Sequence, residues 1–589
     1  MRRNIQALVG VVVLALSSLA FSGQATGADV DPASDGVVAV AVAAAACGDG
    51  SRPETGVQGQ VPRADRDSGR SREGYQCNLE VQGTYQGAGA GVVSARYENC
   101  VYLGSFGTGI AGLQPGVQVV DVSDPSRPRY VRTLISPGMA AGTWESLKVD
   151  ETRGQLAGVG VSVLVGALLF DVYDISEDCT DPQLRNGIVG TPLTVPQNVV
   201  GHEGGFSPDG LTYYASSSTG WLTAIDLSDP TRPRTVFSGA TGLTNHGFSL
   251  SADGRTMYGV TLAPAGLQVL DVSDIQDRAG TPQVREISSL TWPDGLLTQH
   301  TIPFTQDGRT YLVAVDEGGG GSVRILDIDD PTAPTIVRRI RLEINLPENQ
   351  GLRQTDVGGN GLWGYEAHYC TLDRLDSPTA LACGFVQSGI RVFDVRDVRN
   401  PREIAYFNPP AIGGGVTNLL TKVPNSPHAL AVVAPTLIAS EAPTLQNIVG
   451  AVNQDMTTDW CMSPPWFVGS DQLWSTCADT GLTTMRFTNG TYPLADDETP
   501  TTPAPTSPAP PAPPSEGVSG GSGGSSSGGP SARGDAVAAG SHQHSARASG
   551  DLPSAGSSLD PSALAAALAM LMLGLSLLSA ERFRRRLDS

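Results

Sequence analysis

The chain has 589 residues, enough for two to four ordinary domains or for one large β domain with additional segments. Acidic residues outnumber basic residues by 59 to 38, and the net charge of −21 argues against nucleic-acid binding and against attraction to anionic lipid surfaces. Only 16% of the residues are charged, whereas Gly (71) and Pro (42) are abundant, which favours turn-rich β structure with linkers and disfavours a helical bundle.

A secretory signal peptide is predicted at residues 1–28. A basic start at residues 1–3 is followed by an apolar stretch at 7–21 that is short for a membrane span, and then by small residues. Cleavage is expected after Gly27 or Ala28, and an uncleaved anchor is the alternative. Residues 29–73 then form an N-terminal extension.

The other end of the chain predicts a tether. Residues 495–560 are rich first in Thr, Pro and Ala and then in Gly and Ser, so they are expected to be a disordered linker. Residues 561–580 carry no charge and match a transmembrane helix, and the arginine-rich tail at 581–589 should stay cytoplasmic. The sequence LPSAG at 552–556 resembles a sortase sorting signal with Ala555 in the place of Thr, so attachment to a cell wall is the alternative to a membrane anchor.

Between these ends one phrase recurs: an apolar strand that ends in Asp, a short turn that often contains Pro, and a further strand. A second shared element lies upstream, where His202, His246 and His300 are each followed seven residues later by the Asp-Gly of a hairpin turn. One unit therefore has four strands, A to D, and strand C carries the terminal Asp. The copies end at Asp121, Asp174, Asp226, Asp271, Asp327 and Asp394, and a seventh has Arg486 in that place.

Four short strands per unit are typical of a β-propeller, and seven units predict seven blades. The copies GVQVVDVSDPSRP and GLQVLDVSD resemble the LVIVD-repeat family of propeller proteins, over roughly residues 74–494. This resemblance implies an all-β fold, a seven-bladed β-propeller of four-stranded blades, and says almost nothing about chemistry. The Asp that ends strand C is expected to cap the turn that follows it.

Eight cysteines in an exported chain indicate disulfides. Alignment of the units puts pairs of cysteines on strands A and B of blades one, six and seven, where neighbouring strands bring them within bonding range. The two remaining cysteines would join the N-terminal extension to the C–D turn of blade two. The predicted pairs are Cys77–Cys100, Cys370–Cys383, Cys461–Cys477 and Cys47–Cys179.

The same alignment puts one residue per blade at the start of strand A, which lines the central channel of a propeller. The predicted ring consists of Tyr75, Trp144, His202, His246, His300, His368 and Asp459. The two longest insertions, 341–365 and 408–459, are D–A connections, so we expect them at the same channel mouth. Long loops on one face of a rigid scaffold favour binding there.

The ring allows three interpretations. Repetition of a histidine that hydrogen-bonds a neighbouring blade is the simplest, and a metal-free ligand or glycan site is another. Imidazoles and a carboxylate would also suit a divalent transition metal such as zinc, copper or iron, with Glu203 and Glu366 as orienting groups or general base. The candidate metal ligands are His202, His246, His300, His368 and Asp459.

The function predicted first is a binding or interaction module displayed on the cell surface, with a protein or glycan ligand. The alternative is an extracellular metal-dependent enzyme, a hydrolase, lyase or oxidoreductase, with its site at the channel mouth. The membrane helix, a monomeric ectodomain and no nucleic-acid partner complete the expectation.

Overall fold

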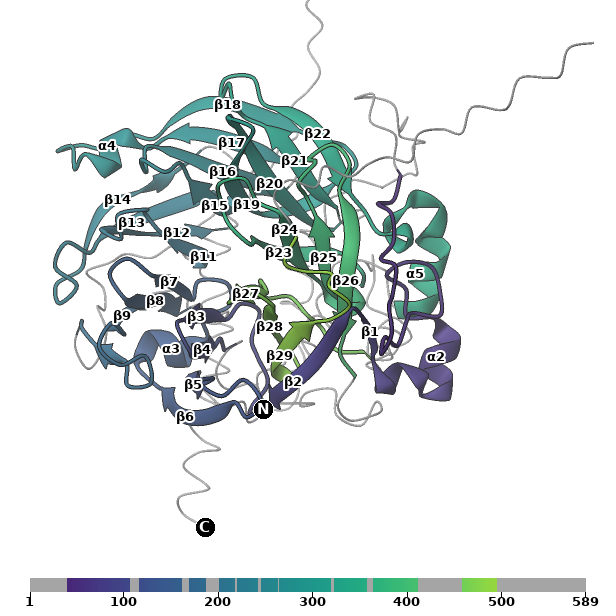
Figure 1. Cartoon of the computed structure of the whole chain (residues 1–589). Coiled ribbons are helices and arrows are strands. Elements are labelled where there is room, and N and C mark those ends of the chain that lie inside the picture. Colours follow the sequence, from purple (N-terminus) through teal and green to yellow (C-terminus); the bar gives the residue numbers. More distant parts are fainter. Residues whose placement is uncertain are drawn as a thin grey trace, which may run out of the picture. The chain divides into compact units, whose positions relative to one another are not determined.

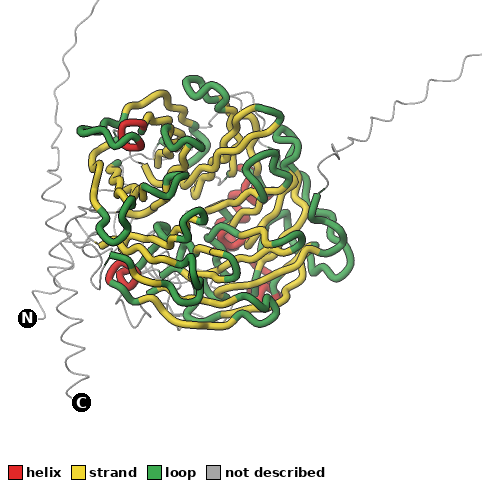
Figure 2. The backbone as a smooth tube through the Cα atoms, turned by 60° about the vertical axis from the view of Figure 1, so that its left-hand side comes forward, coloured by secondary structure: helices red, strands yellow, loops and turns green. Residues whose placement is uncertain are grey.

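The computed structural model describes residues 40–105, 116–160, 169–186, 201–217, 220–241, 245–262, 264–318, 322–357, 364–410 and 458–494. The predicted signal peptide (1–28), linker (495–560), transmembrane helix (561–580) and basic tail (581–589) lie outside these residues. Within the described ranges, no helix has the length and apolar character that crossing a membrane requires. Strands dominate the described chain, and the helices are few and short (Figure 2).

The strands form seven antiparallel sheets arranged as the blades of a propeller, which confirms the predicted fold (Figure 1). In each blade the strands run in order from the channel outwards. Blade one contains β3 (Ala95–Tyr97), β4 (Cys100–Leu103), β5 (Val117–Asp121) and β6 (Arg129–Leu134). Blade two contains β7 (Lys148–Asp150), β8 (Gln155–Gly160), β9 (Leu169–Asp174) and β10 (Gln183–Leu184).

Blades three to five repeat this order with longer strands. Blade three contains β11 (Gly201–Phe206), β12 (Thr212–Ser217), β13 (Trp221–Asp226) and β14 (Arg234–Ala240). Blade four contains β15 (Asn245–Leu250), β16 (Thr256–Leu262), β17 (Ala265–Asp271) and β18 (Arg285–Thr291). Blade five contains β19 (Leu296–Gln306), β20 (Arg309–Gly318), β21 (Val323–Asp327) and β22 (Thr335–Ile340).

The last two blades each include a strand from the N-terminal part of the chain. Blade six contains β23 (Ala367–Leu372), β24 (Ala380–Phe385), β25 (Gly389–Asp394) and β26 (Arg402–Asn408), and β1 (Tyr75–Cys77) adds a fifth, outermost strand. Blade seven contains β27 (Trp466–Val468), β28 (Gln472–Cys477) and β29 (Gly481–Phe487), and its outer strand is β2 (Leu79–Tyr85).

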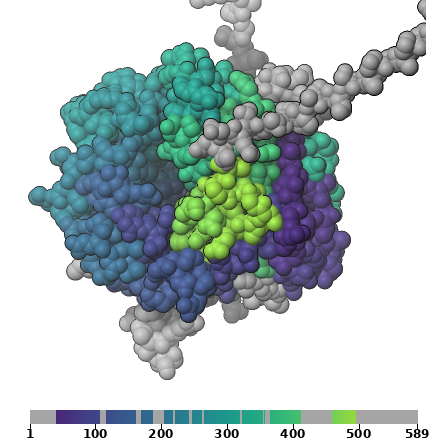
Figure 3. Space-filling view, in the orientation of Figure 1, coloured from purple at the N-terminus to yellow at the C-terminus, as the bar shows by residue number. Residues whose placement is uncertain are grey.

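The pairing of β2 with β29 closes the ring. Figure 1 shows purple β2 beside green β29, and in Figure 3 the yellow-green C-terminal segment lies against purple N-terminal residues. Blade one therefore begins at β3, so the prediction that Tyr75 and Cys77 lie on its inner strand is wrong. Both residues belong to β1, at the outer edge of blade six.

The helices lie outside the blades. They are α2 (Arg63–Ser68), α3 (Pro137–Ala141), α4 (Ser273–Gln276) and α5 (Gln350–Val357), with short 3₁₀ turns η1 (Arg70–Glu73), η2 (Glu343–Asn345), η3 (Pro347–Asn349) and η4 (Val386–Ser388). The N-terminal extension packs against blades five and six, where Val42 and Val61 are buried. Its Glu54 forms a buried ion pair with Arg391 of β25.

Apolar side chains fill the spaces between neighbouring blades. For example, Phe170 and Val172 of blade two pack with Tyr213 and Ile225 of blade three. Trp474 of blade seven likewise packs with side chains of blade one, so the closing interface has the same character as the others. Each blade is therefore stabilised by both of its neighbours.

The terminal Asp of strand C caps the following turn, as predicted. Asp226 Oδ1 accepts hydrogen bonds from the backbone and hydroxyl of Ser228, at 3.0 and 2.6 Å. Its other oxygen accepts from Arg234 at the start of strand D (2.8 Å). The same carboxylate–hydroxyl–arginine arrangement recurs at Asp121, with Ser123 and Arg129.

Four disulfides connect the eight cysteines. Cys370–Cys383 and Cys461–Cys477 were predicted and are confirmed. The other two pairs were predicted wrongly, because the assignment placed Cys77 in blade one: Cys47 bonds Cys77, and Cys100 bonds Cys179.

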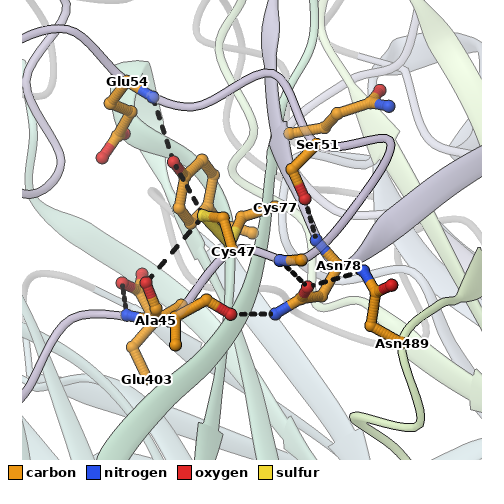
Figure 4. The surroundings of a disulfide bond; sticks show 12 residues. Ala45, Cys47, Ser51, Glu54, Cys77, Asn78, Glu403 and Asn489 are labelled. Carbon is orange, nitrogen blue, oxygen red and sulfur yellow. Dashed lines mark hydrogen bonds between the residues drawn. A yellow bond between two sulfur atoms is a disulfide. The ribbon is translucent and has the colours of Figure 1, made fainter.

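The two corrected disulfides fasten different joints. Cys100–Cys179 joins blades one and two, and Cys47–Cys77 holds the N-terminal extension on β1. Asn78, next to this second bond, donates to the carbonyl oxygens of Ala46 and Ile404, and its side-chain oxygen accepts from Asn489 (Figure 4). Such bonds are typical of proteins that fold in an oxidising compartment.

The capped turns predict a pH dependence of stability. Burial raises the pKa of Asp226, but hydrogen bonds from Ser228 and Arg234 and the charge of Arg278 outweigh it and lower the pKa to about 2. Because the folded pKa is below the unfolded one, this stabilisation is present above about pH 4 and lost as the pH falls towards 2. Asp226→Asn should lower the free energy of unfolding at pH 7 by about 1–2 kcal/mol and match the wild type near pH 2, in urea titrations. Asp229→Asn, in the same turn but exposed, is the control and should change much less.

The disulfides should differ in their effect on stability. Cys100–Cys179 closes a sequence separation of 79 residues and Cys370–Cys383 one of 13. Loop-closure entropy then assigns about 4.5 kcal/mol to the first and about 3 kcal/mol to the second. Guanidinium unfolding of the two double Cys→Ala variants measures the order, and a larger loss from Cys370→Ala/Cys383→Ala would contradict it.

Candidate functional site

The inner strands of blades three to six share one irregularity near their N-terminal ends. In β11, β15, β19 and β23 the pairing register shifts by a β-bulge. A bulge turns side chains away from their regular alternation and is common beside active sites. The histidines of the predicted ring lie at these bulges: His202, His246, His300 and His368.

Glu145 reaches the same region from the loop that precedes β7 in blade two. Trp144 has a φ of 45°, a left-handed conformation that a bulky residue rarely adopts. Its N–H donates to the carbonyl of Ser105 (3.1 Å) and its carbonyl accepts from Val93 (3.0 Å). The backbone of Glu145 also forms a parallel bridge with Glu203 of β11. Blades one and three therefore fix the position of Glu145.

Glu145, Glu203 and His246 form a cluster of candidate metal ligands, with one ligand atom of each within 4.8 Å of the others. His246 lies between the two carboxylates. Its Nε2 is 3.3 Å from Glu145 Oε2 and its Nδ1 is 3.6 Å from Glu203 Oε2. All three side chains are buried, and none exposes more than 6% of its surface.

A second histidine lies on the other side of Glu145. The Nε2 of His368 is 3.3 Å from Glu145 Oε1 and 3.3 Å from Glu317 Oε1, at the end of β20. Its Nδ1 is 3.0 Å from the carbonyl oxygen of Met462, which fixes the orientation of the ring. Glu145 therefore contacts two imidazoles, one with each carboxylate oxygen.

Lys148 of β7 ends the series of charges. Its Nζ is 3.5 Å from Glu203 Oε1 and 4.9 Å from the centre of the Tyr369 ring. Carboxylates and bases thus alternate across five blades in the order Glu317, His368, Glu145, His246, Glu203 and Lys148.

His300 stands beside this series. Its ring packs on Tyr369, with 4.7 Å between ring centres, and it hydrogen-bonds the backbone of Cys370. Within the described residues, its buried Nε2 has no hydrogen-bond partner. This nitrogen is therefore available to a ligand.

The pKa values of His246, His300 and His368 are shifted in different directions. Burial lowers the pKa of His246, but the charge of Glu145 and the hydrogen bond with Glu203 outweigh burial and raise it. For His368, burial is likewise outweighed by hydrogen bonds with Glu145 and Glu317, and the pKa rises to about 10. Without a metal ion, His368 is therefore positively charged at neutral pH, and the two carboxylates favour the charged form of His246.

The opposite holds for His300, whose pKa burial lowers to about 4. It is therefore neutral at neutral pH. Burial would raise the pKa of Glu203, but the charges of Lys148 and the histidines outweigh it, so that the pKa is lowered and the carboxylate is ionised.

Gly247 makes room for the cluster. A Cβ atom at this position would overlap the Glu203 carboxylate and the carbonyl oxygen of Gln299. The residue after His246 is thus small because the carboxylate of the neighbouring blade occupies the space of a side chain.

A cavity of about 460 Å³ runs along the inner strands and borders the cluster at Glu203. Its lining includes Lys148, Glu203, His300 and Tyr369, and it continues past the C-terminal end of β11 to Pro208. This is the end with the A–B turns, opposite to the channel mouth that the sequence predicted as the binding face.

The structure brings only part of the predicted ring together. His246 and His368 flank Glu145, His300 lies beside them, and Trp144 packs with Tyr369 near the channel. The side chain of His202 lies outside the described residues. Tyr75 is on the outer strand β1, so its placement in the ring is wrong.

Asp459 has a different set of contacts. Its carboxylate accepts hydrogen bonds from the backbone N–H groups of Trp460, Asp479 and Thr480, at 2.7–2.8 Å. These bonds hold blade seven together, and Asp459 is not part of the described metal-ligand cluster. Glu366, another predicted orienting group, pairs with Arg353 of α5.

Glu145 and Glu317 were missed, because neither occupies a repeated position. Glu145 follows the residue aligned with the ring, and Glu317 ends a second strand rather than beginning a first one. The only available signal was the acidic pair Asp316–Glu317 beside the His300 strand.

Residues 110–134 match the LVIVD repeat, which blade one contains in its third and fourth strands. The chain is a β-propeller that contains an LVIVD repeat. No curated protein matches its sequence significantly.

Solved structures resemble this LVIVD-repeat propeller at low similarity. A Lactobacillus plantarum protein is 12% identical with a TM-score of 0.37, covering 54% of this chain and 87% of its own. A putative 6-phosphogluconolactonase from Bacteroides fragilis is 10% identical (TM-score 0.38, coverage 52% and 81%). The periplasmic gluconolactonase of Pseudomonas aeruginosa is 14% identical (TM-score 0.40, coverage 56% and 98%). At these values the likeness says nothing about activity.

The alternating charges predict that Glu145 stabilises the metal-free propeller. Glu145→Gln leaves two buried imidazoles without their shared carboxylate, which should lower the free energy of unfolding by about 3 kcal/mol in chelator-treated protein. Glu151→Gln, an exposed acid at the rim of the cavity, is the matched control and should change little. Equal effects of the two variants in guanidinium titrations would contradict the assignment.

Proposed function

We propose that the LVIVD-repeat propeller is a metal-dependent hydrolase with its metal held by Glu145, Glu203 and His246. The convergence of three ligand atoms within 4.8 Å, from three blades and in a buried site, carries this proposal. Three protein ligands leave coordination positions open, as catalytic sites require. Two carboxylates with one imidazole suit zinc, iron(II) or manganese.

The neighbouring groups suit acid–base chemistry. His300 lines the same cavity as Glu203, and its Nε2 is the candidate proton acceptor. A bound ion of this kind polarises a carbonyl group and makes water more acidic. A water molecule adds to the carbonyl carbon of an ester, His300 takes its proton, and this proton passes to the departing alkoxide oxygen. The products are a carboxylic acid and an alcohol, and water is the only co-reactant.

We also propose that the propeller works outside the cytoplasm, tethered through residues 561–580. Its four disulfides support an oxidising environment. Display of a binding surface to a protein or glycan is the second candidate function, which this location supports and which requires no metal.

Metal analysis tests the hydrolase proposal. Protein of residues 29–494, purified without a His-tag or chelator, should contain about one zinc, iron or manganese ion per chain. Glu203→Gln and His246→Ala should remove it, and Glu80→Gln on the outer strand β2 should retain it.

A further variant keeps all three proposed ligands but fills the space that the Glu203 carboxylate occupies. Gly247→Ala should weaken metal binding about tenfold or more, because its methyl group displaces the Glu203 carboxylate. Circular dichroism confirms folding of each variant. A folded, metal-free wild type that takes up no added ion would overturn the proposal and favour the binding module.

A further inference from the structure

The end of the cavity next to the cluster is polar. Lys148, Glu203, His300 and Tyr369 lie there, next to the proposed metal ligands. Most of the remaining wall is apolar. It includes Phe206, Phe248, Ile302, Pro303, Leu372 and Leu375. A ligand that fills this space would therefore have a polar head at the cluster and an apolar body towards the A–B turns.

The size of the cavity limits the ligand. A volume of about 460 Å³ suits a small molecule and is too small for a folded partner. Leu375, at the open end, leaves 58% of its surface exposed. An apolar side chain exposed at the rim of an apolar cavity gains burial when an apolar ligand enters.

Charge limits the ligand further. Among the described residues of the lining, Lys148 is the only Lys or Arg, and its ammonium group already pairs with Glu203. Asp150, Glu151 and Glu203 contribute carboxylates to the same lining. A divalent ion at the proposed ligands would offset the carboxylate of Glu203, but Asp150 and Glu151 lie at the A–B turn that follows β7 and would disfavour a phosphate on the body of the substrate.

We infer that the substrate is a small ester or lactone with an aliphatic or aromatic body and no phosphate, and that it enters from the face of the A–B turns. This inference rests on the proposed function, because the reacting carbonyl is placed at the metal ligands. The apolar walls bind the body of the substrate, and the polar end receives its carbonyl group.

Hydroxamates are suitable probes, since their head group binds divalent metals and their body can be varied. Titration of the metal-loaded protein with benzohydroxamate and acetohydroxamate compares an apolar body with a single methyl group. Benzohydroxamate should bind at least tenfold more tightly, because its ring is buried against the cavity walls.

Two variants fill the cavity without touching a proposed ligand. Ile302→Trp and Thr371→Trp place an indole ring at half-buried positions of the lining, on β19 and β23. Each should abolish the preference for benzohydroxamate and retain the metal. Ile287→Trp, on the outer strand β18 and 37% exposed, is the control and should bind as the wild type does.

The outcomes separate the two proposals. Metal-loaded protein that binds both hydroxamates equally, or keeps the preference after Ile302→Trp and Thr371→Trp, overturns the inference and leaves the metal centre intact. If the protein binds no metal, the proposed function fails, and saturation-transfer NMR with indole tests the cavity by itself. Binding of indole that Ile302→Trp removes then supports the cavity as an apolar ligand site, and no binding overturns it.

Discussion

The pairing of β2 with β29 is the constraint on which the rest of the structure depends. Seven sheets that each pack on two neighbours make a ring, and one joint of that ring has to connect the two ends of the propeller chain. The N-terminal strand supplies this joint as the outer strand of blade seven, so the blade cannot form without both ends. Residues that meet at the axis come from different blades, and their distances are therefore set by closure rather than by any local turn. Glu145 of blade two and His368 of blade six meet only because the ring is shut.

The repeat provides the position of the site, and deviations from the repeat provide its chemistry. Four successive inner strands have a register shift near their N-terminal ends, where the repeated histidines lie. If all four carried the same residues, the axis would hold only like groups. Instead, blade three contributes the carboxylate of Glu203, and blade four contributes the imidazole of His246, which Gly247 follows. Blade six contributes the imidazole of His368, which packs beside Tyr369. Gly247 shows that these differences are complementary, because the Glu203 carboxylate occupies the space that a side chain at position 247 would need.

The sequence was sufficient for the fold and for half of the site. A phrase repeated with an Asp at the end of strand C determines strands, turns and blade number, because each of these is a local property. Ring closure is not a local property. Nothing in residues 75–85 distinguishes an inner strand from the outer strands of blades six and seven. The predictions for Tyr75, Cys77 and Cys100 were wrong for this one reason. The histidines were found because they repeat. Glu145 could not be found in this way, since it lies in a loop whose path is fixed by Val93 and Ser105 of another blade.

The buried charges themselves argue for a ligand at the axis. Glu145, Glu203 and Glu317 are paired in the metal-free protein with Lys148, His246 and His368. A buried series of ion pairs is seldom more stable than apolar side chains of the same volume, because each charge loses its hydration. The spaces between neighbouring blades are filled by apolar packing instead, as between Phe170 and Tyr213. A divalent ion at the proposed centre would compensate the carboxylates of Glu145 and Glu203 directly.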